Sequence, residues 1–229
     1  QRSTSPDTSF NPATSAHGYT IYASDYLQYV VLPRVLPGLR AEAPNIQIQC
    51  LPPKVSGALD MLSGNYVELY IGHYPQPPDS LRARFLFEEA STCLVRKGHP
   101  ALGREWNMAA YLQYQHMDAS GYAGYFNTQV DAALLAQGQR RTVGIVLSSY
   151  VATPFVLAAT DMVATLPSSI AQSLAAASGT VMLPAPLPLP PLSISLYWHE
   201  RYQNDQAHAW LRQHIGAAFG GAGPKLAPQ

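Results

Sequence analysis

Apolar residues follow two spacings along the chain, and the two spacings alternate. Residues 19–23 form a short run of apolar and aromatic side chains, which is typical of a strand. Between residues 27 and 39, apolar side chains recur with the spacing of one helix face. The same alternation continues toward the C-terminal end. The sequence therefore predicts an α/β protein in which crossover helices join parallel strands.

The predicted elements are short and are separated by turn-forming residues. Further strands are predicted at residues 46–50, 67–71, 115–119, 142–147 and 192–198, with extended segments at 85–95 and 181–183. Helices are predicted at residues 55–63, 128–137, 149–159 and 205–219, and another begins at Ser168. Ser24 is a candidate cap of the first helix. Pro33 and Pro37 predict that this helix is kinked or broken, because each proline removes a backbone donor.

Two series of alternation indicate two Rossmann-like lobes, and the extended segments between them indicate that the chain crosses from lobe to lobe twice. The expected boundaries are a linker remnant at 1–17, lobe I at 18–89 plus 192–220, lobe II at 90–191 and a disordered tail at 221–229. Ligands of open α/β sheets bind beyond the carboxyl ends of the strands. We therefore expect a small ligand in a cleft between the lobes.

Composition narrows the class of protein. The chain has 229 residues, and 47% of them are apolar, which is enough for a large core. The formal net charge is zero, and there is no basic stripe of the kind that nucleic-acid-binding domains carry. Cys50 and Cys93 stand far apart, so neither a disulfide framework nor a zinc site is indicated. The chain has no Walker loop and no dinucleotide fingerprint, and we expect no cofactor. Free thiols suit a reducing compartment, and no signal peptide or apolar span is evident, so we expect a cytoplasmic protein away from membranes.

Five segments resemble, in their order and spacing, the effector-binding domain of LysR-type transcription regulators. They are Ile-Tyr-Ala-Ser-Asp-Tyr at 21–26, Glu-Leu-Tyr-Ile-Gly at 68–72, Arg-Lys-Gly-His-Pro at 96–100, Thr-Asp-Met-Val-Ala-Thr-Leu-Pro at 160–167 and Trp-His-Glu-Arg-Tyr at 198–202. The last segment is the most specific. It is similar to the branch that includes the nodulation regulators and the salicylate-responsive regulators of aromatic catabolism.

The resemblance implies a fold similar to type II periplasmic binding proteins, with two α/β lobes joined by two crossover strands and an inducer between them. It also implies that the chain is not an enzyme and assembles as a homodimer or homotetramer. DNA would be bound only through an N-terminal helix-turn-helix that this sequence lacks, and the full-length protein would contact RNA polymerase. The implied inducer is a small aromatic compound, either a phenol or a carboxylate.

In lobe I, the candidate ligand-binding residues lie at strand ends. Ser24, Asp25 and Tyr26 open the first helix, where exposed amides and the helix dipole favour a carboxylate, phenolate or nitro group. Alternatively, Ser24 only caps the helix. His73 and Tyr74 follow the strand at 67–71, and His73 could instead simply close a turn.

In lobe II, His116, Asp118 and Ser120 share one face of the predicted strand at 115–119 and its continuation. His116 matches the family's histidine position, but it could also be a structural histidine bonded to the backbone. A His-x-Asp metal site would need a third ligand, and none is evident. Three further candidates follow the strand at 142–147, namely Ser148, Ser149 and Tyr150. Salicylate-responsive relatives have a histidine at the position of Ser149, which puts salicylate itself in doubt.

Other classes of protein remain open at this point. Tyrosines at predicted strand ends, among them Tyr26, Tyr74 and Tyr150, favour a planar aromatic effector. A solute-binding protein of a transporter would share the two-lobe pattern, and the residues encoded upstream would separate the two. A hydrolase finds little support, because the chain lacks a GxSxG elbow and an HExxH motif.

Overall fold

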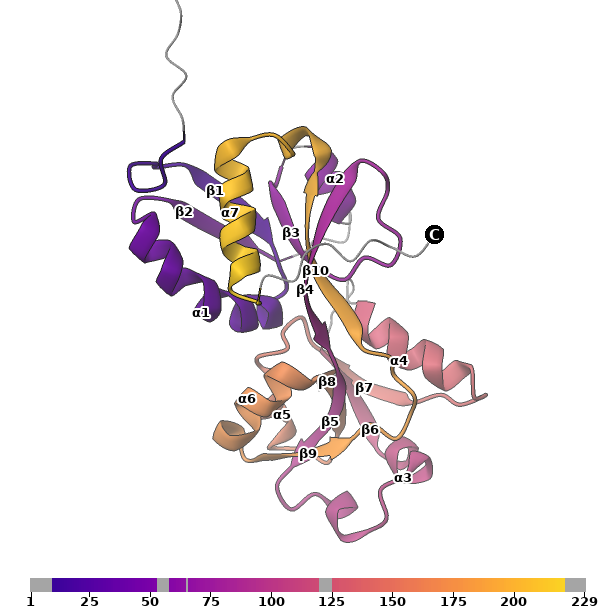
Figure 1. The fold of residues 1–229 in the computed structure, drawn as a ribbon. Helices are drawn as coiled ribbons and strands as arrows, with labels where there is room; N and C mark the ends of the chain where they lie inside the picture. Colours follow the sequence, from indigo (N-terminus) through magenta and orange to yellow (C-terminus); the bar gives the residue numbers. More distant parts are fainter. Residues whose placement is uncertain (1–9, 53–57, 65, 120–124, 221–229) are drawn as a thin grey trace, which may run out of the picture.

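Two lobes joined by a narrow waist make up the fold (Figure 1). The computed structural model describes residues 10–52, 58–64, 66–119 and 125–220. In the waist, two long strands run side by side, β4 (Leu81–Glu89) and β10 (Leu192–His199), which pair from Leu192 with Glu89 to His199 with Leu81. These two strands connect the lobes, so the predicted α/β class with two lobes and two crossings is confirmed.

Each lobe is built on one five-stranded sheet. The sheet of lobe I has the order β2 (Gln47–Leu51), β1 (Gly18–Tyr22), β3 (Leu69–Gly72), β10 and β4. The sheet of lobe II has the order β7 (Thr142–Val146), β6 (Gln115–Asp118), β8 (Val163–Pro167), β5 (Ser91–Arg96) and β9 (Thr180–Pro184).

The predicted parallel strands are present, but each sheet is mixed. Strand β1 is parallel to β2 and β3, and β6 is parallel to β7 and β8, as crossover helices require. However, β10 is antiparallel to β3 and β4, and β5 is antiparallel to β8 and β9. Strands β5 and β10 each enter their sheet from the other lobe. They therefore run antiparallel to the strands that the crossover helices connect.

The helices cover the sheets as the alternation predicts. They are α1 (Asp25–Glu42), α2 (Ala58–Ser63), α3 (Met108–Gln113), α4 (Tyr125–Leu135), α5 (Thr153–Leu157), α6 (Ser168–Ser178) and α7 (Gln206–Ala217), with short 3-10 helices at Pro100–Gly103 and Glu200–Tyr202. In lobe II, α5 and α6 lie on one side of the sheet and α4 on the other (Figure 1). Helices α1 and α6 contact each other across the two lobes.

Helix α1 is continuous through both of its prolines, so the helix is not broken there. Val35 and Leu39 are buried, whereas Pro33 and Pro37 lie on the exposed face. Each proline leaves the carbonyl one turn earlier without its amide partner, and on the exposed face that carbonyl can bond to water. Burial of the opposite face therefore holds the helix together.

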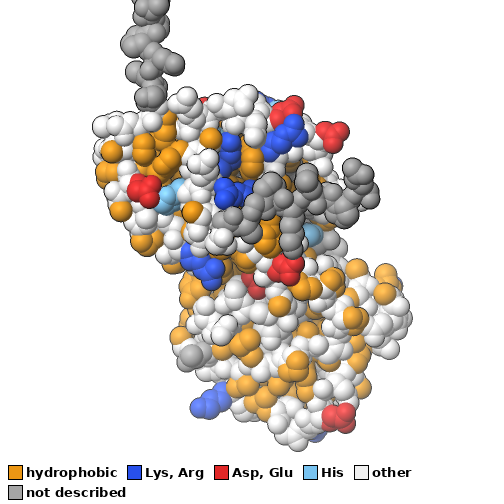
Figure 2. Space-filling view, in the orientation of Figure 1, with side chains coloured by type: hydrophobic (Ala, Val, Ile, Leu, Met, Phe, Trp, Pro, Cys, Tyr) orange, Lys and Arg blue, Asp and Glu red, His pale blue; other side chains and the backbone are white. Residues whose placement is uncertain are grey.

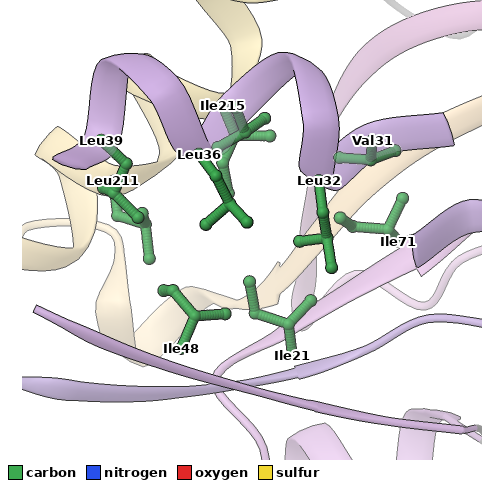
Figure 3. A pocket seen from close by; sticks show the side chains of 10 residues that line it. Ile21, Val31, Leu32, Leu36, Leu39, Ile48, Ile71, Leu211 and Ile215 are labelled. Atoms are coloured by element: carbon green, nitrogen blue, oxygen red, sulfur yellow. The ribbon is translucent and has the colours of Figure 1, made fainter. Parts of the chain in front are cut away.

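The two faces of the lobe I sheet have different partners because neighbouring side chains of a strand point to opposite sides. Ile21, Ile48 and Ile71 face α1 and α7, where apolar side chains surround a gap of about 10 Å³ (Figure 3). On the other face, Tyr22 and Tyr197 pack with residues of α2. The gap is wholly apolar and has room for about one water molecule at most, so it is a packing defect rather than a ligand site.

The surface shows no continuous basic stripe on the face seen in Figure 2. Most charged side chains of this face lie on lobe I and at the waist, whereas lobe II presents mainly apolar and uncharged polar groups. In the described part of the chain, no helix combines the length and the apolar character needed to cross a membrane. Of the predicted linker, residues 10–17 are described, and the ring of Phe10 lies 5.7 Å from that of Trp210 in α7. The predicted tail at 221–229 lies outside the described residues.

Candidate ligand-binding site between the lobes

The N-terminus of α1 reaches from lobe I to lobe II. Ser24 caps the helix, as predicted, and its Oγ accepts a bond from the amide of Leu27 at 3.5 Å. The carboxylate of Asp25 accepts hydrogen bonds from the Ser149 hydroxyl at 2.8 Å and from the Val151 amide at 3.1 Å. The sequence made Asp25 a candidate ligand-binding residue at the helix start, and in the structure it also joins the lobes.

Ser149 organises the segment that meets Asp25. Helix α5 begins at Thr153, later than the predicted start at Ser149. The Oγ of Ser149 accepts a bond from the Ala152 amide at 3.1 Å, and the hydroxyl of Thr153 donates to the Ser149 carbonyl at 3.1 Å. These contacts fold residues 149–152 into a turn that precedes the helix. Ser148 is exposed on the strand side of this turn.

Two tyrosines meet beside this contact, one from each lobe. The rings of Tyr26 and Tyr150 lie 5.3 Å apart, edge to face, and these residues are 5% and 6% exposed. The Tyr26 hydroxyl is buried without a hydrogen-bond partner among the described residues. Burial raises the pKa of Tyr26 well above its usual value, and the charge of Glu89 raises it further. The Tyr26 hydroxyl is therefore neutral, and within the part of the chain that the structure describes it lacks a hydrogen-bond partner.

Glu89, at the end of the waist strand β4, was missed by the sequence analysis. It is 3% exposed, and its carboxyl accepts bonds from the Ser169 amide at 3.0 Å and the Ser169 hydroxyl at 2.5 Å. It thereby occupies the N-terminus of α6. Burial raises the pKa of Glu89, although the bonds from Ser169 and the charge of Arg34 oppose this shift. The serine pair at the start of the predicted helix was a signal for such a cap, but no spacing rule connects it to residue 89.

His73 and Tyr74 lie where β3 leaves the lobe I sheet. The Nδ1 atom of His73 is 3.1 Å from the carbonyl oxygen of Ser193. The Tyr74 amide donates to the hydroxyl oxygen of Tyr197 at 3.2 Å, and the ring of Tyr197 stacks on Tyr70 at 5.7 Å. These residues form an aromatic group at the lobe I end of the waist.

His116 lies inside lobe II. It is fully buried, its Nε2 is 2.9 Å from the Tyr111 carbonyl oxygen, and the two rings lie 4.3 Å apart. Burial lowers the pKa of His116 to about 4, so the ring is neutral at pH 7. This is the backbone-bonded, structural arrangement that the sequence had left open. Asp118 is half-buried at the end of β6, and Ser120 lies outside the described residues.

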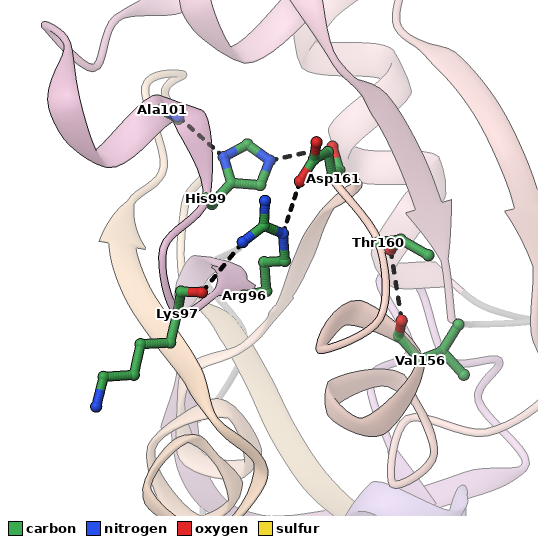
Figure 4. A network of polar contacts seen from close by, with 7 residues as sticks. All are labelled: Arg96, Lys97, His99, Ala101, Val156, Thr160 and Asp161. Atoms are coloured by element: carbon green, nitrogen blue, oxygen red, sulfur yellow. Dashed lines mark hydrogen bonds and ion pairs between the residues drawn. The ribbon is translucent and has the colours of Figure 1, made fainter.

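Two of the segments that carried the family resemblance pack against each other in lobe II (Figure 4). Arg96 donates to the Asp161 carboxylate at 2.6 Å. The Nδ1 atom of His99 accepts from the Ala101 amide at 3.0 Å, so its Nε2 carries the proton and donates to the Asp161 carbonyl at 3.0 Å. Their role is structural, since they tie the end of β5 to the segment before β8.

The polar groups of the inter-lobe site suit binding better than catalysis. Ser149 bonds directly to a carboxylate, and the described contacts include no histidine that could act as its base. The described ranges also hold no group of three or more His, Cys, Asp or Glu side chains placed to bind a metal ion. The site instead offers a carboxylate, a serine hydroxyl and two tyrosines, contributed by both lobes.

Comparisons with known proteins agree with this architecture. The family model described as the LysR substrate binding domain matches residues 15–220. The chain is 32% identical over 215 residues to the HTH-type transcriptional regulator SyrM of Rhizobium meliloti, covering 94% of this chain and 66% of SyrM. It is 29% identical over 205 residues to the HTH-type transcriptional activator NahR of Pseudomonas putida, covering 90% of this chain and 68% of NahR.

A solved structure shows the same fold. The regulatory domain of MexT, a transcriptional activator of Pseudomonas aeruginosa, superposes with a TM-score of 0.78 at 26% identity, covering 90% of this chain and all of that domain. The chain spans about two thirds of the length of its curated relatives. These proteins are transcription regulators and not enzymes, in agreement with the sequence-based interpretation.

Proposed function

Because the chain belongs to the LysR substrate-binding domain family, we propose that it senses a small aromatic effector, a phenol or a carboxylate, in a cleft between its two lobes. The observation that carries this proposal is the meeting of Asp25 with Ser149 and Val151. Polar groups from both lobes lie within hydrogen-bond distance there, beside the paired rings of Tyr26 and Tyr150. Apolar walls with a few convergent polar groups are typical of small-molecule sites.

The proposed switch is a change in the arrangement of the lobes. An effector that bonds to groups of both lobes favours the arrangement in which those groups fit it best. The size of the population shift is set by the difference between its affinities for the two arrangements. Strands β4 and β10 are the connections across which such a movement takes place.

The remaining parts of the function belong to a longer protein. In this proposal, an N-terminal helix-turn-helix outside the present sequence binds DNA, and the lobes transmit the effector signal to it. The assembly is a homodimer or homotetramer that contacts RNA polymerase. A protein that acts on bacterial DNA works in the cytoplasm, so this location follows from the same proposal.

A thermal-shift screen tests the proposal. The purified chain would be heated with phenols, aromatic carboxylates, amino acids and sugars, each in separate wells. A true effector at a hundredfold excess over its Kd stabilises the chain by about 2.7 kcal/mol. Stabilisation by aromatic compounds supports the proposal. If only amino acids or sugars stabilise the chain, the aromatic assignment is wrong, and a solute-binding protein of a transporter becomes the better interpretation.

A variant of the site tests whether a stabilising compound binds between the lobes. Ser149→Ala removes the hydroxyl that lobe II presents to Asp25, and it should weaken binding of any effector found. Ser173→Ala is a matched control, because among the described residues the Ser173 hydroxyl bonds within α6, to the carbonyl of Ser169. Equal loss of affinity in both variants would place the ligand elsewhere.

A further inference from the structure

The amides at the start of α1 are already occupied by groups of this chain. The amide of Tyr26 donates to the side chain of Asp25 at 2.8 Å, and the amide of Leu27 donates to the Ser24 hydroxyl. A free helix N-terminus would attract an anionic ligand. Here the anion is Asp25 itself. The amides of Tyr26 and Leu27 are therefore not free to bind the carboxylate of a ligand.

The lobe II side of the boundary is occupied in the same way. The Val151 amide, in the turn before α5, donates to Asp25, and the Ser169 amide, in the first turn of α6, donates to Glu89. Carboxyl groups of lobe I and of the waist strand thus fill both positions. A carboxylate ligand would have to displace them and would then lie beside negative charge.

No cation of the described residues compensates these carboxyl groups by a direct ion pair. The ion pairs of the described ranges join Arg82 with Glu200, Arg96 with Asp161, Arg141 with Asp131 and His214 with Glu42. The charge of Arg34 lowers the pKa of Glu89, but the guanidinium of Arg34 lies over the ring of Phe219, 5.2 Å from the ring centroid. The charge balance of the boundary therefore favours a ligand without negative charge.

A second observation indicates that a polar ligand group belongs here. The hydroxyl of Tyr26 is buried and has no hydrogen-bond partner among the described residues, and its ring packs on Tyr150 from the opposite lobe. Buried polar atoms are rarely left unpaired in native proteins. Polar groups of an effector could accept from Tyr26 and donate to the carboxylate of Asp25, and a hydroxyl can take either role because it is both acceptor and donor.

From these contacts we infer that the effector is an uncharged, hydroxyl-bearing aromatic compound and that Asp25 determines this specificity by accepting a hydrogen bond from it. This inference rests on the proposed function and selects between the phenols and the carboxylates that it left open. Ser149 and Val151 hold Asp25 in place, and the effector hydroxyl shares the carboxylate with them when it binds.

Isothermal titration calorimetry with matched probes tests the inference. Salicyl alcohol and salicylate form one pair, and vanillyl alcohol and vanillate form another. Within each pair only the hydroxymethyl and carboxylate groups differ. The wild-type chain should bind the alcohol of a pair at least about tenfold more tightly than the acid. In Asp25→Asn, which keeps the shape but removes the charge, this preference should fall to about threefold or less.

Glu42→Gln serves as the control, since it removes the same charge from the opposite end of α1, and it should keep the wild-type preference. Thermal unfolding without ligand shows whether each variant is folded. Tighter binding of salicylate or vanillate by the wild type would overturn the inference while leaving aromatic sensing intact. An unchanged preference in folded Asp25→Asn would also overturn it. Failure of all four probes and of the wider phenol and carboxylate screen would overturn the proposed function, and the inference with it.

Discussion

Asp25 and Ser149 lie 124 positions apart in the chain, and the Ser149 hydroxyl donates a 2.8 Å hydrogen bond to the Asp25 carboxylate. One residue opens α1 in lobe I, and the other precedes α5 in lobe II. A change in the angle between the lobes must lengthen or break this bond. The pair is therefore a direct indicator of the arrangement of the lobes.

Removing the carboxylate should loosen the contact between the lobes. Asp25→Ala leaves the Ser149 hydroxyl and the Val151 amide without their acceptor, and hydrogen bonds to charged groups each contribute about 1.5–3 kcal/mol. Because Asp25 is partly exposed, we expect a loss of about 1–2 kcal/mol in the free energy of unfolding by urea. Small-angle X-ray scattering should show a larger radius of gyration.

Glu105→Ala provides the comparison for this variant, because Glu105 is exposed in lobe II. Its free energy of unfolding should remain within about 0.5 kcal/mol of the wild type. If Asp25→Ala matches this control in both stability and radius of gyration, the contact between the lobes does not hold them together.

The unpartnered hydroxyl of Tyr26 gives a prediction of opposite sign. Tyr26→Phe removes a buried polar atom that has no partner among the described residues, so the ligand-free chain should gain about 1 kcal/mol of stability. Tyr111→Phe is the matched change, since the Tyr111 hydroxyl bonds to the Thr165 hydroxyl at 2.8 Å. That variant should lose about 1 kcal/mol. Chemical denaturation measures both, and a destabilised Tyr26→Phe would show that this hydroxyl has a partner.

His116 should make stability depend on pH. Burial lowers the pKa of His116 from 6.5 to about 4, so between these values the unfolded chain binds a proton that the folded chain does not. The contribution of neutral His116 to the free energy of unfolding is therefore fully present above about pH 6.5. It is lost as the pH falls toward 4, by up to about 3 kcal/mol.

Urea unfolding of wild type and His116→Gln at several pH values in this range measures the effect. The variant should show a smaller loss of stability on acidification than the wild type. His208, whose pKa burial also lowers to about 4, offers a second variant with the same expected sign. Identical pH dependence in all three proteins would mean that neither histidine is held neutral by the fold.

Glu89 should act as the cap of α6. Glu89→Ala leaves the Ser169 amide and hydroxyl without their acceptor and should cost about 1–3 kcal/mol. Glu89→Gln keeps one acceptor oxygen and should cost less.

Glu89 should also make stability depend on pH. Burial raises the pKa of Glu89, and the stability that this shift contributes is present at low pH and is lost as the pH rises through the raised pKa. The difference in free energy of unfolding between wild type and Glu89→Gln should thus be smaller at pH 7 than at pH 4. A larger difference at pH 7, measured by urea unfolding, would contradict this account.

Local patterns in the sequence were sufficient to predict the elements and several candidate residues. The apolar run before Ser24 and the helical spacing after it identified β1, the cap and α1, because each depends only on neighbouring residues. The continuity of α1 through Pro33 and Pro37 was not predicted, because it depends on how the helix packs. The direction of β10 was missed because it depends on the return of the chain from lobe II.

The contacts of the site could not be predicted in the same way. Asp25 and Ser149 were both candidates, but their bond depends on the distance between two lobes that no local pattern encodes. Glu89 lay in a segment predicted to be extended, and its burial against α6 arises only when the waist strands form. His116 followed the family resemblance, which carried no information about the helix that covers it.

The most direct test of ligand sensing between the lobes is a crystal structure of the chain with the aromatic compound that stabilises it most. The account predicts electron density for the ligand between the lobes, with its polar groups within hydrogen-bond distance of Asp25 and Tyr26. Density in the apolar gap beneath α1, or on the outer surface of a single lobe with the bond between Asp25 and Ser149 undisturbed, would contradict it.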